Sequence, residues 1–231
     1  MTLIGYWPLN ESSGDTAYDH SGNENHGSLT GGTTAGSSGV LKQNAYSFDN
    51  SSGGVNIGRP LPCEYLTMTA WVNWDSLTGP LNNYPRVLTD HSGSSVDTGG
   101  LTLDDRQRIT FGDWVTPSDS APGRGPPSTS YSPNTGEWYF LAATYSKDTG
   151  DIILYVNGVQ EDSYNAGTGG LRDGCKSPDS DAWIGTDPGG RTMGGKISEV
   201  RIYDRPLSKS EVQYLYQVGQ RGLQTTSKKS S

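Results

Sequence analysis

Alternating hydrophobic and polar positions predict short β-strands along most of the chain. In "LTMTAWVNW", residues 66–74, every second side chain is apolar, and "KISEVRIY", residues 196–203, also carries alternating apolar side chains. Such period-two alternation is typical of strands that bury one face. Turn signals such as Asn157–Gly158 separate the runs, as in β-hairpins. We predict strands at residues 3–9, 45–48, 55–57, 66–74, 86–90, 101–104, 108–112, 137–145, 152–157, 182–185 and 196–203.

Helical periodicity is convincing only near the C-terminus. "SKSEVQYLY" begins with Ser208 and has Glu211 three residues later, which is the pattern of a capping box. Val212, Leu215 and Tyr216 then share one face. We predict a short helix that closes onto a β-sandwich formed by residues 1–218. The following "GQRGLQTTSKKSS" offers little for a core and is predicted to be a polar C-terminal tail, residues 219–231.

Composition and charge narrow the function classes. The 32 glycines and 13 prolines among 231 residues suit many short strands joined by tight turns. A net charge of −8 without a basic stripe argues against nucleic acid as a partner. No segment approaches the ~18 consecutive apolar residues of a membrane span. Cys63 and Cys175 are either two free thiols or one disulfide between loops.

Six separated blocks carry a family resemblance. In order they are "IGYWPLNESSGDTAYDHSGNENHGSLTGG", "AYSFDNSSGGVNIG", "LTMTAWVNW", "GEWYFLAATYSKDTGDIILYVNGVQE", "AWIGTD" and "GGKISEVRIYDRPLSKSEVQYLY". Together they resemble the laminin-G-like domains of the concanavalin A-like lectin/glucanase superfamily, across roughly residues 3–217. The resemblance implies an all-β jelly-roll sandwich of two antiparallel sheets with one short C-terminal helix. It also implies a module that binds glycans or proteins, often with structural calcium.

The stretch "YDHSGNENHG", residues 18–27, is the candidate metal loop. It crowds oxygen-bearing side chains of the kind that calcium prefers, and Gly22 and Gly27 let the backbone turn its carbonyls inward. The alternative is a polar turn that holds itself together by side-chain to backbone hydrogen bonds.

The resemblance assigns the ligands of this predicted Ca²⁺. It implies that Asp19 contributes its carboxylate, that Asn23 and His26 offer backbone oxygens, and that Glu199 joins them from the last strand. The calcium would pin the N-terminal loop to that strand and take no part in chemistry. Alternatively, Glu199 pairs with Arg201 or lies in water.

Strand parity suggests a sugar-binding face. The positions opposite the predicted core mix aromatic with polar side chains, a mixture that suits the apolar faces and hydroxyls of sugars. The alternatives are that loops cover this face, with Trp71 an ordinary core residue, and that Trp114 belongs to a small core within the long loop 113–136. The predicted ligand-binding residues are Trp71, Trp114, Tyr155, Arg201 and Tyr203.

Catalysis is not predicted. A glycosidase needs two carboxylates about 5–10 Å apart, and the E-x-D-x-E-type strand of the superfamily's glucanases does not occur here. We predict a non-catalytic, calcium-stabilised glycan-recognition or adhesion module, displayed extracellularly or on the surface of a particle such as a virion. "MTLIGYWPLN" lacks the basic and long apolar regions of a signal peptide. The alternative is a structural or decoration protein whose partners are other chains of a large assembly; a glycoside hydrolase ranks third.

Overall fold

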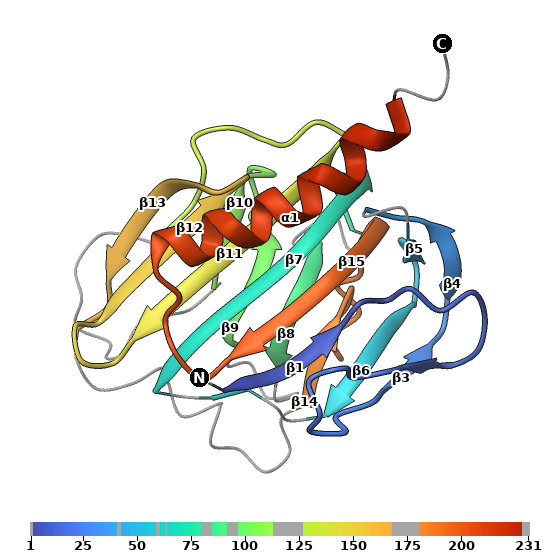
Figure 1. The fold of residues 1–231 in the computed structure, drawn as a ribbon, viewed down its shortest axis with the longest axis horizontal. Coiled ribbons are helices and arrows are strands. Elements are labelled where there is room, and N and C mark those ends of the chain that lie inside the picture. Colours follow the sequence, from blue (N-terminus) through green and yellow to red (C-terminus); the bar gives the residue numbers. More distant parts are fainter. Residues whose placement is uncertain are drawn as a thin grey trace.

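Two antiparallel β-sheets pack face to face, and a helix lies across the outer face of one of them (Figure 1). The computed structural model describes residues 2–40, 43–58, 61–62, 64–79, 85–91, 97–112, 127–167 and 181–227. This architecture confirms the predicted jelly-roll sandwich. Cys63, Cys175 and Trp114 lie outside the described residues.

The first sheet has eight strands in the order β13-β12-β11-β7-β15-β5-β4, with β1 paired to β15. Its strands are β1 (Leu3–Trp7), β4 (Thr33–Ser38), β5 (Asn44–Asp49), β7 (Tyr65–Ser76), β11 (Trp138–Ser146), β12 (Asp151–Val156), β13 (Val159–Asn165) and β15 (Gly194–Tyr203). The second sheet has seven strands in the order β10-β9-β8-β14-β6-β3-β2. They are β2 (Thr16–Ala17), β3 (Gly27–Thr30), β6 (Gly54–Gly58), β8 (Arg86–His91), β9 (Asp97–Leu103), β10 (Ile109–Phe111) and β14 (Asp181–Ile184).

The main core fills the space between the sheets. Alternation along β7 sends Met68, Val72 and Trp74 into this core, where Trp7 of β1 joins them. From the second sheet, strands such as β8 and β14 contribute Leu88 and other buried aliphatic side chains. The predicted parity of β7 is therefore confirmed.

A second apolar cluster lies on the other face of the first sheet, beneath the helix α1 (Lys209–Ser227). The Trp71 ring stacks on Tyr216 of the helix with centroids 5.8 Å apart, and it also contacts Phe140 of β11. Tyr155 of β12 and Val212 of the helix belong to the same cluster. The central strands are therefore buried on both faces, as in sheets covered by helices.

The start of α1 confirms the predicted capping box. The Ser208 backbone N–H donates to Glu211 Oε2 at 2.8 Å, and the Glu211 N–H donates back to Ser208 Oγ at 3.4 Å. The helix then continues to Ser227, so residues 219–227 of the predicted tail are helical. Gly219 lies inside the helix because the Trp71 indole leaves no room for a Cβ there.

Candidate functional site

The N-terminal loop, residues 18–26 between β2 and β3, folds around the Asp19 carboxylate. Oδ1 accepts the N–H of Tyr6 at 2.9 Å and that of Ser21 at 2.8 Å, while Oδ2 accepts Ser21 Oγ at 2.7 Å and the N–H of Asn25 at 3.0 Å. Burial raises the pKa of this carboxyl, but the donors outweigh it and hold the pKa below its usual range. Asp19 is thus an anion held by four protein donors.

The neighbouring polar side chains tie the same loop to β1. The Asn23 amide donates to the carbonyls of Leu3 at 2.9 Å and Ile4 at 3.0 Å. His26 Nδ1 accepts the Asp19 N–H at 3.1 Å. These contacts match the self-bonded polar turn that was the alternative to a metal loop.

Glu199 lies at a β-bulge of β15, where its backbone adopts a φ of 57°. Its buried carboxylate accepts the Tyr6 hydroxyl at 3.1 Å and pairs with Arg201 at 2.5 Å. The Arg201 guanidinium also lies 4.1 Å from the centre of the Tyr6 ring. Burial is the largest of the causes that raise the pKa of Tyr6 to about 12. Glu199 therefore has a permanent cation beside it.

This donor set does not fit the predicted calcium site. Calcium needs open carboxylate and carbonyl oxygens, whereas Asp19 is surrounded by N–H and O–H donors and Glu199 already has Arg201. Within the described ranges, no three His, Cys, Asp or Glu side chains gather where they could hold a metal. We derive no role for a metal from this loop.

The predicted sugar-binding residues are not brought together. Trp71 and Tyr155 are buried beneath α1, which corrects their assignment as ligand contacts, because the apolar face of the helix needs an apolar partner. Arg201 is engaged with Glu199 and Tyr6. Tyr203, by contrast, lines a pocket.

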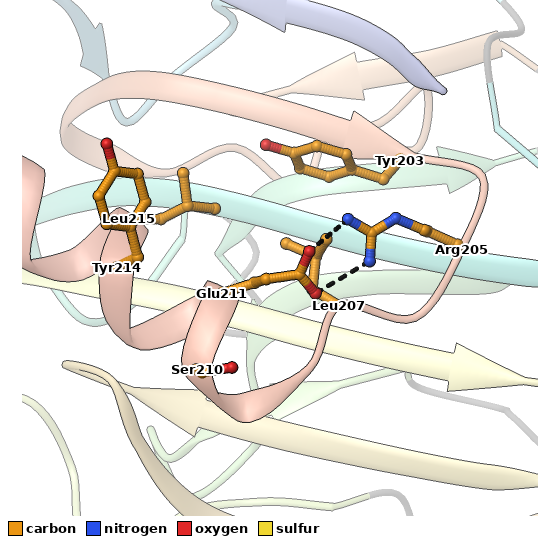
Figure 2. Close-up of a pocket in the computed structure, with 7 residues that line it drawn as sticks. All are labelled: Tyr203, Arg205, Leu207, Ser210, Glu211, Tyr214 and Leu215. Carbon is orange, nitrogen blue, oxygen red and sulfur yellow. Dashed lines mark hydrogen bonds and ion pairs between the residues drawn. The ribbon is translucent and has the colours of Figure 1, made fainter. Parts of the chain in front are cut away.

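That pocket lies where the chain leaves β15 and enters α1, and we call it the α1 pocket (Figure 2). Its volume is about 340 Å³. Two tyrosines, two leucines and one ion pair provide most of its lining. The lining residues are Tyr203, Arg205, Leu207, Ser210, Glu211, Tyr214 and Leu215.

The charged part of the lining is a two-pronged ion pair. Arg205 Nη1 donates to Glu211 Oε2 at 2.9 Å, and Nη2 donates to Oε1 at 2.5 Å. Ser208 of the capping box also donates to this carboxylate, through its N–H at 2.8 Å and its hydroxyl at 2.9 Å. The Arg205 guanidinium and then the Ser208 N–H lower the pKa of Glu211 to about 2. Both charges are therefore fixed in place at neutral pH.

The aromatic part of the lining combines one exposed ring with one half-buried ring. The Tyr214 side chain, on the first turns of α1, is 65% exposed. Tyr203, at the end of β15, lies on the other side of Leu215 (Figure 2). The pocket thus offers aromatic surface beside fixed donors and acceptors. The sequence analysis missed Tyr214 and Arg205, because it interpreted "YDRPLSKSEVQYLY" only as a capped helix. One signal was present: Tyr214 lies two positions after Val212, so its aromatic ring is on the opposite face of the helix from the apolar face.

Other buried acidic groups serve the structure. Asp187 is paired with Arg86 at 3.0 Å and with Arg191 at 2.6 Å. Like Asp19 and Glu199, it is a buried carboxylate whose oxygens already have partners within the chain. Such paired groups suit the role of structural anchor, because breaking a buried pair is strongly destabilising. No helix in the described part of the chain is long and apolar enough to cross a membrane.

Comparisons with known proteins agree on the architecture. Residues 49–213 match the sequence model of the family described as "Concanavalin A-like lectin/glucanases superfamily". No curated protein matches the chain. One similar structure is domain 4 of AbnA, a GH43 extracellular arabinanase from Geobacillus stearothermophilus, solved in complex with arabinotriose. Its TM-score is 0.60 and its identity 20%, and the alignment covers 93% of this chain and 98% of that domain.

A second similar structure is much larger than this chain. Trypanosoma rangeli sialidase, solved with 2,3-difluoro-KDN, has a TM-score of 0.63 and 18% identity. The alignment covers 93% of this chain but 32% of the sialidase. At these identities the similarity shows the fold alone.

Proposed function

Because the chain belongs to the concanavalin A-like lectin/glucanase superfamily, we propose that it is a non-catalytic carbohydrate-recognition module that binds glycan at the α1 pocket. One observation carries this proposal: an exposed tyrosine ring stands beside a fixed carboxylate–guanidinium pair in one concave site.

Sugars present two kinds of surface, and the pocket has a counterpart for each. Their C–H faces pack on aromatic rings, a role available to Tyr214 and Tyr203. Their hydroxyls both donate and accept hydrogen bonds, which suits Glu211 as acceptor and Arg205 as donor. A volume of about 340 Å³ is at the small end of ligand pockets, of order 300–1,000 Å³, and suits a short stretch of glycan.

The non-catalytic part of the proposal rests on the charges. Hydrolysis by two carboxylates requires one that is protonated at working pH and a second about 5–9.5 Å away. Glu211 is the one carboxylate in the lining, and its pKa is lowered rather than raised. The arabinotriose complex of the arabinanase domain supports sugar binding by this architecture, and the extracellular setting of that enzyme supports display on an exterior surface.

Titration with a panel of neutral oligosaccharides tests the proposal. Binding by the unaltered chain should be weakened about tenfold or more by Tyr214→Ala, because loss of a well-packed aromatic contact costs more than ~1 kcal/mol. Tyr18→Ala is the matched control, since Tyr18 is 51% exposed but lies in the N-terminal loop. The same mixtures should show no release of reducing ends. Equal weakening by both variants, or hydrolysis that Glu211→Gln abolishes, would refute the proposal.

A further inference from the structure

We propose that the α1 pocket selects neutral sugars and rejects their uronic-acid counterparts, an inference that rests on the proposed function. It goes beyond sugar binding as such, because it assigns the chemical class of the ligand from the charges that line the site.

The lining has no net charge to offer an anion. Arg205 and Glu211 are the charged residues of the lining, and they cancel each other through two direct contacts. Ser208 also holds the carboxylate, with two further hydrogen bonds. Glu211 is therefore fixed at the helix start and does not swing away to leave Arg205 for another anion.

The Arg205 donors are also poorly placed for an incoming carboxylate. Both Nη atoms point one N–H at Glu211, as the dashed lines in Figure 2 show. Nε is buried and has no hydrogen-bond acceptor among the described residues, so a ligand does not reach it without moving the wall. A ligand carboxylate that approached the open edge of the guanidinium would also lie close to Glu211.

Sugar hydroxyls can form hydrogen bonds with both Glu211 and Arg205, whereas a carboxylate can do so only with Arg205. Glu211 only accepts hydrogen bonds and Arg205 only donates them. Two neighbouring sugar hydroxyls can donate to Glu211 and accept from Arg205 at once. The carboxylate that replaces one hydroxymethyl group in a uronate only accepts, so at that position the ligand loses the contact with Glu211 and meets like charge instead. The chain's net charge of −8 adds a repulsion of longer range.

The experiment compares each neutral oligosaccharide with its uronic-acid counterpart of the same length and linkage, such as galactose with galacturonic acid oligomers. We expect the neutral member of a binding pair to bind at least about tenfold more tightly, with its affinity reduced by Tyr214→Ala. Glu211→Gln should reverse this preference by leaving Arg205 as an unbalanced cation. Glu24→Gln is the control for net charge, because Glu24 is exposed and lies in the N-terminal loop.

A second variant tests the charge of the lining without altering the Ser208–Glu211 cap, which Glu211→Gln changes. Ser210→Lys adds a cation to the lining and keeps the Ser208–Glu211 cap, so it should raise the affinity for the uronate by several-fold. Thermal unfolding would verify that each variant is folded. A uronate that binds the unaltered chain more tightly, still sensitive to Tyr214→Ala, would overturn the selectivity and leave the proposed function standing. Binding of neither class would overturn the proposed function and this inference with it.

Discussion

Among the described residues, two glutamate–arginine pairs differ in environment: Glu199–Arg201 lies in β15, and Glu211–Arg205 lies at the start of α1. Glu199 and Arg201 are buried, with side chains 3% and 15% exposed, whereas Glu211 and Arg205 are 37% and 27% exposed. The buried pair also has the Tyr6 hydroxyl and ring against it. The open pair stands at a pocket beside Tyr214, whose ring faces solvent.

The buried polar groups hold the fold together, whereas the open ion pair leaves polar surface at the pocket. Asp19 and Glu199 find their donors within the chain: Asp19 fastens the N-terminal loop to β1, and Glu199 of β15 contacts Tyr6 of β1 and Arg201. At the α1 pocket, the ion pair is fixed but its outer edge and the aromatic surface remain available. Buried ion pairs are costly to break, while exposed ones contribute little to stability.

The two arginines should contribute unequally to stability. Arg201→Gln should lower the free energy of unfolding by about 3 kcal/mol, because it leaves the buried Glu199 carboxylate without its cation. Arg205→Gln should cost under about 1 kcal/mol, since its partner is solvated. Urea unfolding of both variants measures the difference. Equal losses would contradict the assignment of structural and functional pairs.

The helix α1 forms a wall of the pocket, so the pocket depends on how this helix is seated on the first sheet. A Cβ at Gly219 would overlap the Trp71 indole. Gly219→Ala should therefore destabilise the fold by about 1–2 kcal/mol, although Gly→Ala in a helix interior normally stabilises it by roughly 1 kcal/mol. Gln217→Ala, at an exposed helix position, is the control. Stabilisation by Gly219→Ala in thermal unfolding would mean that the helix is not seated on Trp71.

The open pair should also leave a small signature in acid. Arg205 and the Ser208 N–H lower the pKa of Glu211 to about 2, from an ordinary 4.5. Its stabilising contribution is therefore present above pH 4.5 and is lost as the pH falls towards 2. Solvent screening keeps it under about 1 kcal/mol. Unfolding measured across this range should show a slope that Glu211→Gln reduces; identical slopes would place the carboxylate outside the pair.

The smallest effect concerns calcium. Protein donors already surround Asp19, so the melting temperature should be the same within about 1 °C with added Ca²⁺ and with EDTA. A tightly bound ion would instead stabilise the folded chain by several kcal/mol and raise the melting temperature. A rise with calcium that Asp19→Ala abolishes would restore the metal loop predicted from "YDHSGNENHG".

Much of the fold follows from the sequence, because strands such as β7 and β15 carry apolar alternation. Strands β4 and β13 were missed, since "TTAGSS" and "VQEDSYN" pair through their backbones at sheet edges without burying an apolar row. The prediction that Trp71 and Tyr155 bind sugar was wrong, because α1 covers them. Periodicity shows that the helix has an apolar face, but it does not show which surface of the sheet that face will cover. The α1 pocket depends on that docking, and Tyr203 was its one predicted member.

The most direct test of the central claim is the affinity of a neutral oligosaccharide for the unaltered chain, Tyr214→Ala and Tyr18→Ala, measured side by side by calorimetric titration. We predict about tenfold weaker binding for Tyr214→Ala alone. Both variants should melt at the temperature of the unaltered chain, because both rings are largely exposed. Unchanged affinity in Tyr214→Ala would place any sugar site elsewhere and contradict the assignment of the α1 pocket.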